Sequence, residues 1–371
     1  MRIFGVHNIK FPSSTAHSIY ATRISCALAQ GAPLKLYVDR DTENFRDIES
    51  AWKFYSLVPP ENLEVYAPNI RHKGVSGILR RTHLLMDIYK YRNDKCLIVH
   101  TTQPKPAASV ARLKKILPVR FILAMEVHQF EDGLQKALLM ADVLMPTTSD
   151  LEKDLIEVYR CKQPMLKIGH IIDIKKYRVS PVDKLNNDKF VIGYMGNLYW
   201  WKGIDTIIEA MVHLPDSVRL KIVGGDPKSD NAEKIRMWAK KNGVFNRIEL
   251  VGFVSPDSVS TAMEECHALI LPLKYQKDIK GALPQKLLEY MAMGRAVIAS
   301  DLPGILDVAH DNQNALIFKE NNPDDLAMKI KILLNDRTLL NRLANSALVT
   351  ARDYDEPIAV KRIIDFWGGL V

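Results

Sequence analysis

Lys202 stands where a phosphate-binding side chain would be useful. It lies in the segment GNLYWWKG (196–203), which follows a strand-like run and opens a helix-like stretch. Free backbone N–H groups and the dipole at a helix N-terminus favour an anion, so a phosphate or pyrophosphate suits this place. An ordinary surface lysine beside a loop is the alternative interpretation.

Glu289 is the one carboxylate in a short apolar helix within PQKLLEYMAMGRAVIASDLPG (284–304). Its apolar neighbours do not explain it, so it is a second candidate for binding chemistry. Gly224 and Gly225 end a nearby strand-like run. Glycines there let a ligand approach the backbone, or they only form a turn.

His128 and the segment around Ser14 are candidates in the first half of the chain. His128 ends a strand-like run and is followed by a loop, so its role is either structural or functional. Ser14, Thr15 and Ala16 precede a helix-like stretch. These residues either cap that helix or, with its N-terminus, hold a phosphate.

No metal site is expected. The sequence Asp39-Arg40-Asp41 imitates an Asp-x-Asp metal clamp, but it directly follows a strand, where a solvated turn is the natural interpretation. The four cysteines are scattered, without a CxxC pair or zinc-ligand histidines. They are expected to be small core residues of a protein in a reducing cytoplasm.

The elements that must position these residues alternate along the chain. Continuous apolar strands separated by helices predict parallel sheets buried on both faces. The expected strands of the first half are 2–6, 33–39, 95–101, 120–127 and 142–148, and its expected helices are 18–30, 106–116, 131–141 and 149–159. The expected strands of the second half are 190–196, 218–225, 248–254, 268–273, 296–300 and 315–318.

A polar stretch at 178–189 predicts a linker between two doubly wound α/β domains, 1–180 and 189–352. The two domains should face one another across a cleft. Ligands of such sheets bind outside the carboxyl ends of the strands.

Charge is unevenly distributed along the chain. The formal net charge is +8, and residues 1–185 hold 28 Lys and Arg against 19 Asp and Glu, so the excess lies in the first half. An anionic membrane surface or an acidic substrate would suit this half, and the segment 111–120 reads either as a membrane-facing or as a solvated helix. No aromatic-interleaved basic stripe indicates a nucleic-acid partner. No apolar run could span a bilayer or form a signal peptide.

The second half resembles the donor-binding domain of retaining glycosyltransferases of family 4, which have the GT-B fold of two Rossmann-like domains. The resemblance is carried by the segments 196–203, 251–273, 284–318 and 323–336. The first half is similar to the family more weakly, through 12–31 and the EVHQF segment around His128. By analogy, the final segment 355–371 should form a helix that packs back on the N-terminal domain.

The resemblance implies roles for individual residues. Glu289 matches a glutamate that accepts hydrogen bonds from the ribose of a nucleotide sugar, Lys202 matches the lysine that neutralises the leaving pyrophosphate, and His128 matches an acceptor-side histidine. Backbone groups around Gly252 and Phe253 would hold the base. The remaining residues implied in donor binding are Gly196, Asn197, Gly281, Ala282, Leu283 and Lys286.

Two positions depart from the family pattern. Gly281 stands where the first motif glutamate should be, and Asn197 stands where the family has a pyrophosphate-binding arginine. Lys286, or Lys280 nearby, could take over part of the lost contact.

The resemblance implies a transferase of polysaccharide biosynthesis. The scattered cysteines favour the cytoplasm for it, and the positive charge of the first half favours peripheral contact with the inner membrane face. This transferase would move a sugar from a nucleotide-diphosphate donor to a glycan, lipid-linked or other acceptor with retention of configuration, without a metal or other cofactor. The alternatives are a non-catalytic GT-B partner subunit or glycan-binding protein, and epimerisation of a nucleotide sugar. The sequence leaves the base open between uracil, guanine and adenine.

Overall fold

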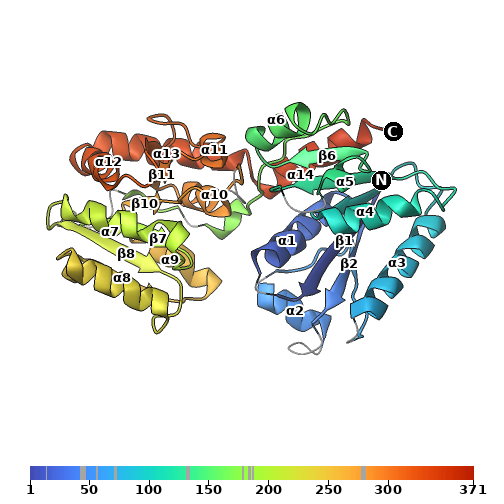
Figure 1. Ribbon diagram of the computed structural model, residues 1–371, viewed down its shortest axis with the longest axis horizontal. Coiled ribbons are helices and arrows are strands. Elements are labelled where there is room, and N and C mark those ends of the chain that lie inside the picture. The colour runs from blue at the N-terminus through green and yellow to red at the C-terminus, as the bar shows by residue number, and fades with distance from the viewer. Residues whose placement is uncertain are drawn as a thin grey trace. The chain divides into compact units, whose positions relative to one another are not determined.

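The computed structural model of this chain divides into two compact units. Unit 1 comprises Met1–Ile171 and Glu356–Val371, and unit 2 comprises Ile172–Asp355. The structure describes residues 1–13, 15–41, 47–55, 57–70, 73–130, 134–177, 179–182, 185, 188–276 and 281–371. Figure 1 shows the elements of both units.

Among the described residues, unit 1 contains one six-stranded parallel sheet in the order β3-β2-β1-β4-β5-β6. Its strands are β1 (Arg2–Phe11), β2 (Leu34–Arg40), β3 (Leu63–Tyr66), β4 (Leu97–Thr101), β5 (Ile122–Val127) and β6 (Val143–Pro146). Its helices are α1 (Ala16–Gly31), α2 (Ile48–Tyr55), α3 (Lys73–Lys90), α4 (Pro104–Leu113), α5 (Leu134–Leu138), α6 (Ser149–Glu157) and α14 (Glu356–Gly368).

Unit 2 repeats this plan. Within its described part, the sheet has six parallel strands in the order β12-β11-β10-β7-β8-β9. The strands are β7 (Phe190–Met195), β8 (Val218–Val223), β9 (Ile248–Gly252), β10 (Ala268–Leu271), β11 (Ala296–Ser300) and β12 (Leu316–Phe318). The helices are α7 (Ile204–Val212), α8 (Asp230–Lys241), α9 (Pro256–Glu264), α10 (Gln285–Ala292), α11 (Pro303–Leu306), α12 (Pro323–Asn335) and α13 (Arg337–Arg352), with short 3₁₀ turns η1 (Ile174–Lys176), η3 (Trp200–Lys202) and η4 (Phe245–Arg247).

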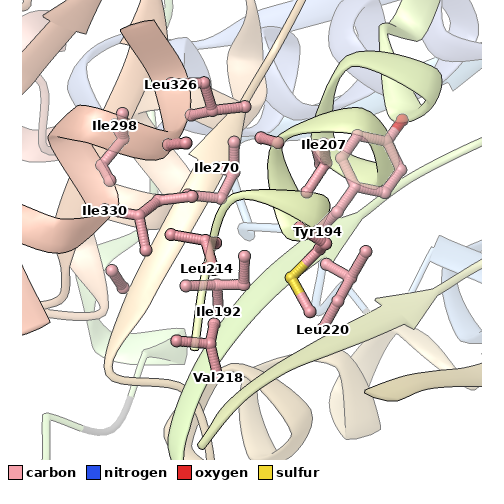
Figure 2. Packing of buried hydrophobic residues seen from close by; sticks show 14 of the residues in the cluster. Ile192, Tyr194, Ile207, Leu214, Val218, Leu220, Ile270, Ile298, Leu326 and Ile330 are labelled. Carbon is pink, nitrogen blue, oxygen red and sulfur yellow. The ribbon is translucent and has the colours of Figure 1, made fainter. Parts of the chain in front are cut away.

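Both faces of each sheet are buried. Successive side chains of a strand point to opposite sides, so each strand contributes to two cores. In unit 2, Ile270 and Ile298 pack with α7 and α12, as Figure 2 shows for the core around Leu326. The adjacent Leu269 and Val297 belong to the opposite core, beneath α10. This explains the continuous apolar strand sequences and confirms the predicted α/β class.

Each sheet has the strand order of a doubly wound nucleotide-binding fold, with a switch point between β1 and β4 and between β7 and β10. At a switch point the connections leave the sheet on opposite faces, and a crevice opens beyond the carboxyl ends of the strands. The functional residues of each unit are therefore expected at these ends.

The two segments at which the chain passes from one unit to the other are hydrogen-bonded to each other. Ile172 N–H donates to Tyr354 O at 3.0 Å, and Ile174 N–H donates to the Asp355 carboxylate at 3.1 Å. Beyond this point α14 packs against α1, with Trp367 fully buried in unit 1. The structure thus divides at Ile171, whereas the sequence analysis placed the linker at 178–189.

The segment 39–41 corrects one expectation. Asp39 and Arg40 belong to β2, and the Asp39 carboxylate binds the Arg80 guanidinium at 3.0 Å and the Ser76 hydroxyl at 2.6 Å. Asp41 is buried. The prediction of a solvated turn is wrong because α3, which the sequence analysis did not predict, covers this strand end.

Candidate active site

Lys202 lies at the carboxyl edge of the sheet of unit 2. It ends η3, and Gly203 follows with φ +75° as the N-cap of α7. A Cβ atom at Gly203 would lie 1.7 Å from the Pro272 carbonyl oxygen, so only glycine fits between η3 and the end of β10. This close contact fixes the place of Lys202.

The Lys202 ammonium is partly desolvated. Its Nζ lies 3.9 Å from the centroid of the Trp201 ring. Burial, with the nearby charge of Lys286, lowers the pKa of Lys202 to about 8. Within the described part of the chain, neither lysine has an ion-pair or hydrogen-bond partner, whereas the neighbouring Lys274 is paired with Asp205 at 2.6 Å. Two uncompensated cations at one strand end make a site for an anion.

Gly196 allows Lys286 to reach this edge. A Cβ atom at Gly196 would lie 2.9 Å from Lys286 Cε and 2.8 Å from the Tyr194 hydroxyl oxygen. Lys286 extends from the first turn of α10 toward the end of β7. The structure therefore brings together Lys202, which was predicted to neutralise the leaving pyrophosphate, with Gly196 and Lys286, which were predicted to bind the donor.

Glu289 lies on α10 one turn after Lys286. Its side chain is half-buried, and no hydrogen bond or ion pair engages its carboxylate in the described residues. Residues three apart on a helix are neighbours on its surface. The helix thus presents an unengaged cation and an unengaged carboxylate on one side.

Two buried tyrosines hold the end of β7, and the sequence analysis did not identify them. The Tyr290 hydroxyl accepts from Met195 N–H at 2.8 Å and donates to Met195 O at 3.2 Å, joining α10 to β7. The Tyr194 hydroxyl donates to Asn197 O at 2.8 Å, while the Asn197 side chain is exposed. Tyr290 directly follows Glu289, which is the sequence signal that could have indicated it.

Gly252 lies beside the same strand ends. Gly224 N–H donates to Gly252 O at 2.7 Å, and Gly196 N–H donates to Val223 O at 2.8 Å. Gly252 has φ +86°, and a Cβ atom there would lie 2.3 Å from Pro227 Cγ. The next residue, Phe253, is 79% exposed. This turn exposes the Phe253 ring, while Gly252 itself is buried.

The segment 281–283 lies between β10 and α10. Gly281 is buried with φ +75°, and Leu283 is buried in the core beneath α10. The Ala282 carbonyl oxygen would lie 2.2 Å from a Cβ atom at Gly304, so this segment packs tightly on the start of α11. A side chain at position 281 would be strained in this backbone conformation. The neighbouring Lys280 lies outside the described residues.

In unit 1, His128 belongs to a network around a buried carboxylate. The Glu126 carboxylate receives His128 Nε2 at 2.7 Å and the Tyr20 hydroxyl at 2.8 Å on one oxygen, and His100 Nε2 at 2.8 Å on the other. Burial would raise the pKa of Glu126, but the hydrogen bonds and charges of His100 and His128 outweigh it and hold the pKa far below its usual range. An ionised glutamate therefore orients His128.

Further histidines extend this network. The Thr102 hydroxyl bridges His7 Nδ1 at 3.1 Å and His17 Nε2 at 3.0 Å. Burial, together with neighbouring histidines, lowers the pKa of His7 and lowers that of His17 to about 4. Among the described residues, no group of three His, Cys, Asp or Glu side chains could hold a metal ion.

The sequence analysis did not identify His7, His100 and Glu126 as one group, although their positions in the sequence have a feature in common. His7, His100 and Glu126 all lie in or next to the carboxyl halves of strands of unit 1. Parallel strands bring such positions to one edge.

Thr15 caps α1. Its hydroxyl oxygen accepts from Ser18 N–H at 3.3 Å, and Ala16 begins the helix. Ser14 lies outside the described residues. Phosphate binding by this segment remains a prediction, as do the assigned roles of the other site residues.

Comparison with known proteins shows which family the second half of the chain resembles. Residues 177–349 match the sequence model of glycosyl transferases group 1. The N,N'-diacetylbacillosaminyl-diphospho-undecaprenol alpha-1,3-N-acetylgalactosaminyltransferase of Campylobacter jejuni is 27% identical over 188 residues, which are 50% of this chain and 47% of that protein. The chain thus spans about half the length of the curated relatives it matches.

Solved structures resemble the whole chain at low sequence identity. Anabaena HepE in complex with UDP matches with a TM-score of 0.77 and 17% identity over 100% of both chains. Sucrose-phosphate synthase from Thermosynechococcus elongatus matches with a TM-score of 0.74 and 16% identity, over 100% of this chain and 99% of the other. The chain therefore has the GT-B fold, and its residues 177–349 match the glycosyl transferases group 1 model, which confirms the predicted fold and the predicted resemblance to this group.

Replacing Tyr290 with Phe should destabilise unit 2. The substitution leaves the buried backbone groups of Met195 without the hydroxyl, which costs about 1–3 kcal/mol. Urea unfolding of Tyr290→Phe measures this loss. Tyr199→Phe, at a 49% exposed tyrosine, should leave stability unchanged. Equal stability of both variants would contradict the bracing role of Tyr290.

The folded protein should lose stability on acidification from pH 7 to pH 5. His17 has a pKa of about 4 when folded and 6.5 in its ordinary state, so the unfolded chain binds the extra proton in this range. The free energy of unfolding therefore decreases as the pH is lowered from 7 to 5, by about 1–2 kcal/mol for this one histidine. Urea unfolding at pH 7 and at pH 5 measures this loss of stability. Between these pH values, His17→Gln should lose about 1–2 kcal/mol less than wild type. His310→Gln, at an exposed histidine, serves as the control; a wild-type pH dependence in His17→Gln would refute the assignment.

Proposed function

We propose that this protein is a retaining glycosyltransferase that moves a sugar from a nucleotide-diphosphate donor to an acceptor hydroxyl. The bond between the anomeric carbon and the donor phosphate breaks, and a bond from that carbon to the acceptor oxygen forms. The nucleoside diphosphate leaves, and the hydroxyl proton is released. The observation that carries the proposal is a pair of lysines and a neighbouring carboxylate in unit 2 that have no hydrogen-bond or ion-pair partner among the described residues.

Lys202 and Lys286 suit the diphosphate of the donor. Their charges repel each other in the free protein, which contributes to the lowered pKa of Lys202. A bound diphosphate would remove that repulsion and offset the desolvation of Lys202. Because negative charge grows on the diphosphate as the sugar leaves, preorganised cations stabilise the transition state more than the ground state.

Glu289 suits the ribose of the nucleotide. A carboxylate can accept hydrogen bonds from both ribose hydroxyls, and such charged bonds are stronger than neutral ones. One helical turn separates it from Lys286, matching the short separation between a ribose and its diphosphate. The backbone at Gly252 and the exposed ring of Phe253 would receive the base.

Lys286 is proposed to replace the arginine that the family has at the position of Asn197. The Asn197 carbonyl is held by Tyr194 and its side chain is exposed. The Lys286 side chain instead passes close to Gly196, so a second cation is still present at the strand end. This arrangement supports binding of the diphosphate without a metal ion.

His128 is proposed to contact the transferred sugar or the acceptor. Its Nε2 is engaged with Glu126, so Nδ1 is the ring nitrogen left for a substrate. The ionised Glu126 fixes which nitrogen faces the substrate.

The proposed acceptor is a glycan, a lipid-linked sugar or another anionic molecule. The Campylobacter jejuni relative is named for a diphospho-undecaprenol acceptor, and the first half of this chain carries the excess positive charge. No helix in the described residues is long and apolar enough to cross a membrane. We propose a cytoplasmic protein that contacts the inner membrane face peripherally.

A non-catalytic GT-B subunit or glycan-binding protein is the second candidate. Gly281 at the position of the first motif glutamate is the observation that favours it. Such a protein would bind a nucleotide sugar or glycan without turning it over, so a turnover assay separates the two candidates.

Glu289→Ala should weaken nucleotide binding selectively. Losing charged hydrogen bonds to the ribose costs about 1.5–3 kcal/mol, which is roughly 10- to 150-fold in affinity. Calorimetry with UDP, GDP and ADP measures this and identifies the base. Glu209→Ala, another half-buried carboxylate without a partner in the described part of unit 2, should bind as wild type does. Unchanged affinity in Glu289→Ala would refute the ribose assignment.

Lys202 should control turnover and its pH dependence. Lys202→Ala should lower kcat by about 10²–10³, as for loss of one preorganised donor. With a pKa of about 8, Lys202 loses its proton at higher pH, so kcat/KM of wild type should fall above pH 8. Lys202→Arg stays protonated and should move this fall to higher pH. The kcat/KM profile from pH 6 to 10 tests this, and identical profiles in wild type and Lys202→Arg would exclude Lys202 as the titrating group.

A further inference from the structure

A cavity in unit 1 lies apart from the histidine network. It has a volume of about 170 Å³ and lies between β1, α3 and α4, lined by Val6, Asn8, Gly77, Arg80, Arg81 and Lys105 among others. Val6 and Asn8 alternate along β1 with His7, whose side chain belongs to the histidine network. Since alternate side chains face opposite sides of a sheet, the cavity and the network lie on different faces.

Arg80 is held rigidly at the base of the cavity. Its guanidinium donates to the His7 carbonyl at 3.0 Å and to the Asn8 side chain at 3.3 Å, and it pairs with Asp39 at 3.0 Å. Its side chain is 12% exposed. The Asp39 carboxylate balances this charge, so Arg80 shapes the cavity without adding net charge.

Arg81 and Lys105 give the cavity a net positive charge. Burial lowers the pKa of Arg80, and the charge of Arg81 lowers it further, so Arg81 lies close to Arg80. No described residue forms an ion pair with Arg81 or Lys105. Two cations from two different helices therefore converge on one cavity without a counter-ion, and a dianion would neutralise both.

The rest of the lining suits an organic phosphate. A phosphomonoester carries about −1.5 to −2 charges at neutral pH and three acceptor oxygens. The volume exceeds that of several waters at about 30 Å³ each, so it admits a phosphate with attached carbon atoms. Leu84 and Pro106 supply apolar contacts, and a Cβ atom at Gly77 would meet no atom within 4 Å, so this wall is open.

We propose that this cavity binds the phosphoryl group of a phosphorylated acceptor through Arg81 and Lys105. The assignment of this ligand as the acceptor rests on the proposed glycosyltransferase function, whereas anion binding itself does not. The phosphate belongs either to a soluble sugar or polyol phosphate or to a lipid headgroup. In both cases the same two cations and the open wall at Gly77 recognise it.

The first experiment measures binding of glycerol 3-phosphate in the absence of any nucleotide, by calorimetry at low salt with glycerol as the reference. Wild type should bind glycerol 3-phosphate, and the affinity should fall as salt is added. The double variant Arg81→Gln, Lys105→Gln should bind at least about tenfold more weakly. Absence of binding by wild type, or equal binding by the double variant, would overturn the proposal.

Two further variants locate the ligand. Gly77→Leu fills the open wall without changing charge, and the side chain favours a helix, so folding should be kept while affinity drops by about tenfold. Lys153→Gln removes an exposed lysine of α6 that does not line the cavity, and should bind as wild type does. Undiminished binding in Gly77→Leu would place the anion elsewhere.

The lysine pair of unit 2 could also attract this probe. The variant Lys202→Ala, Lys286→Ala should keep its affinity for glycerol 3-phosphate, and loss of binding there would assign the anion to unit 2 and overturn the proposal. The transferase function can fail its own test without affecting this site. Binding that depends on Arg81 and Lys105, in a protein that shows no transferase activity, would refute the proposed function but not the anion site.

Vesicles distinguish the two sources of phosphate. Sedimentation with phosphatidate vesicles that depends on Arg81 and Lys105, and that glycerol 3-phosphate competes away, would support a lipid headgroup. Binding of the soluble ester without selective sedimentation on phosphatidate over phosphatidylcholine would support a soluble acceptor. Sedimentation unaffected by the double variant would count against this cavity as the lipid site.

Discussion

The bond between Tyr290 and the end of β7 is the constraint on which the site in unit 2 depends. The buried hydroxyl engages both backbone groups of Met195, so α10 cannot shift along the sheet without leaving buried polar groups unpaired. Gly196 follows directly, and the absence of a side chain there lets Lys286 pass. The positions of Lys286 and Glu289 on α10 follow from this attachment, whereas Lys202 is placed by the close packing of Gly203 against the Pro272 carbonyl.

The two units differ in how the charged side chains of their candidate sites are paired. In unit 1 the Glu126 carboxylate is surrounded by donors and its histidines are held in place, which stabilises one fixed arrangement. In unit 2 the lysine pair and Glu289 are left without partners in the described residues. Uncompensated, partly desolvated charge destabilises a free protein, and a ligand of opposite charge recovers that energy on binding. This difference is why unit 2 carries the stronger argument for a ligand.

The departures from the family motif have a backbone component. Position 281 adopts φ +75°, a conformation that glycine tolerates and a glutamate does not. A glutamate at this position would therefore strain the backbone that the chain adopts here. Lys286 enters the space that Gly196 leaves, so the site keeps two cations although the arginine is absent. In the proposed site, Lys286 supplies the second positive charge from α10.

The sequence alone determined the class and order of the elements, because continuous apolar runs between helical stretches can be buried only in a parallel sheet with two covered faces. It also indicated Lys202, Glu289 and His128, which lie next to recognisable strand and helix ends. It missed α2, β3 and α3, although α2 is amphipathic, and β3 has only four residues, none of them buried. Only the tertiary structure showed that Glu126 joins His128 to His100, that Tyr290 braces Met195, and that Arg81 and Lys105 line one cavity. These contacts join residues from 2 to 95 positions apart, and a linear pattern does not contain the strand order that brings them together.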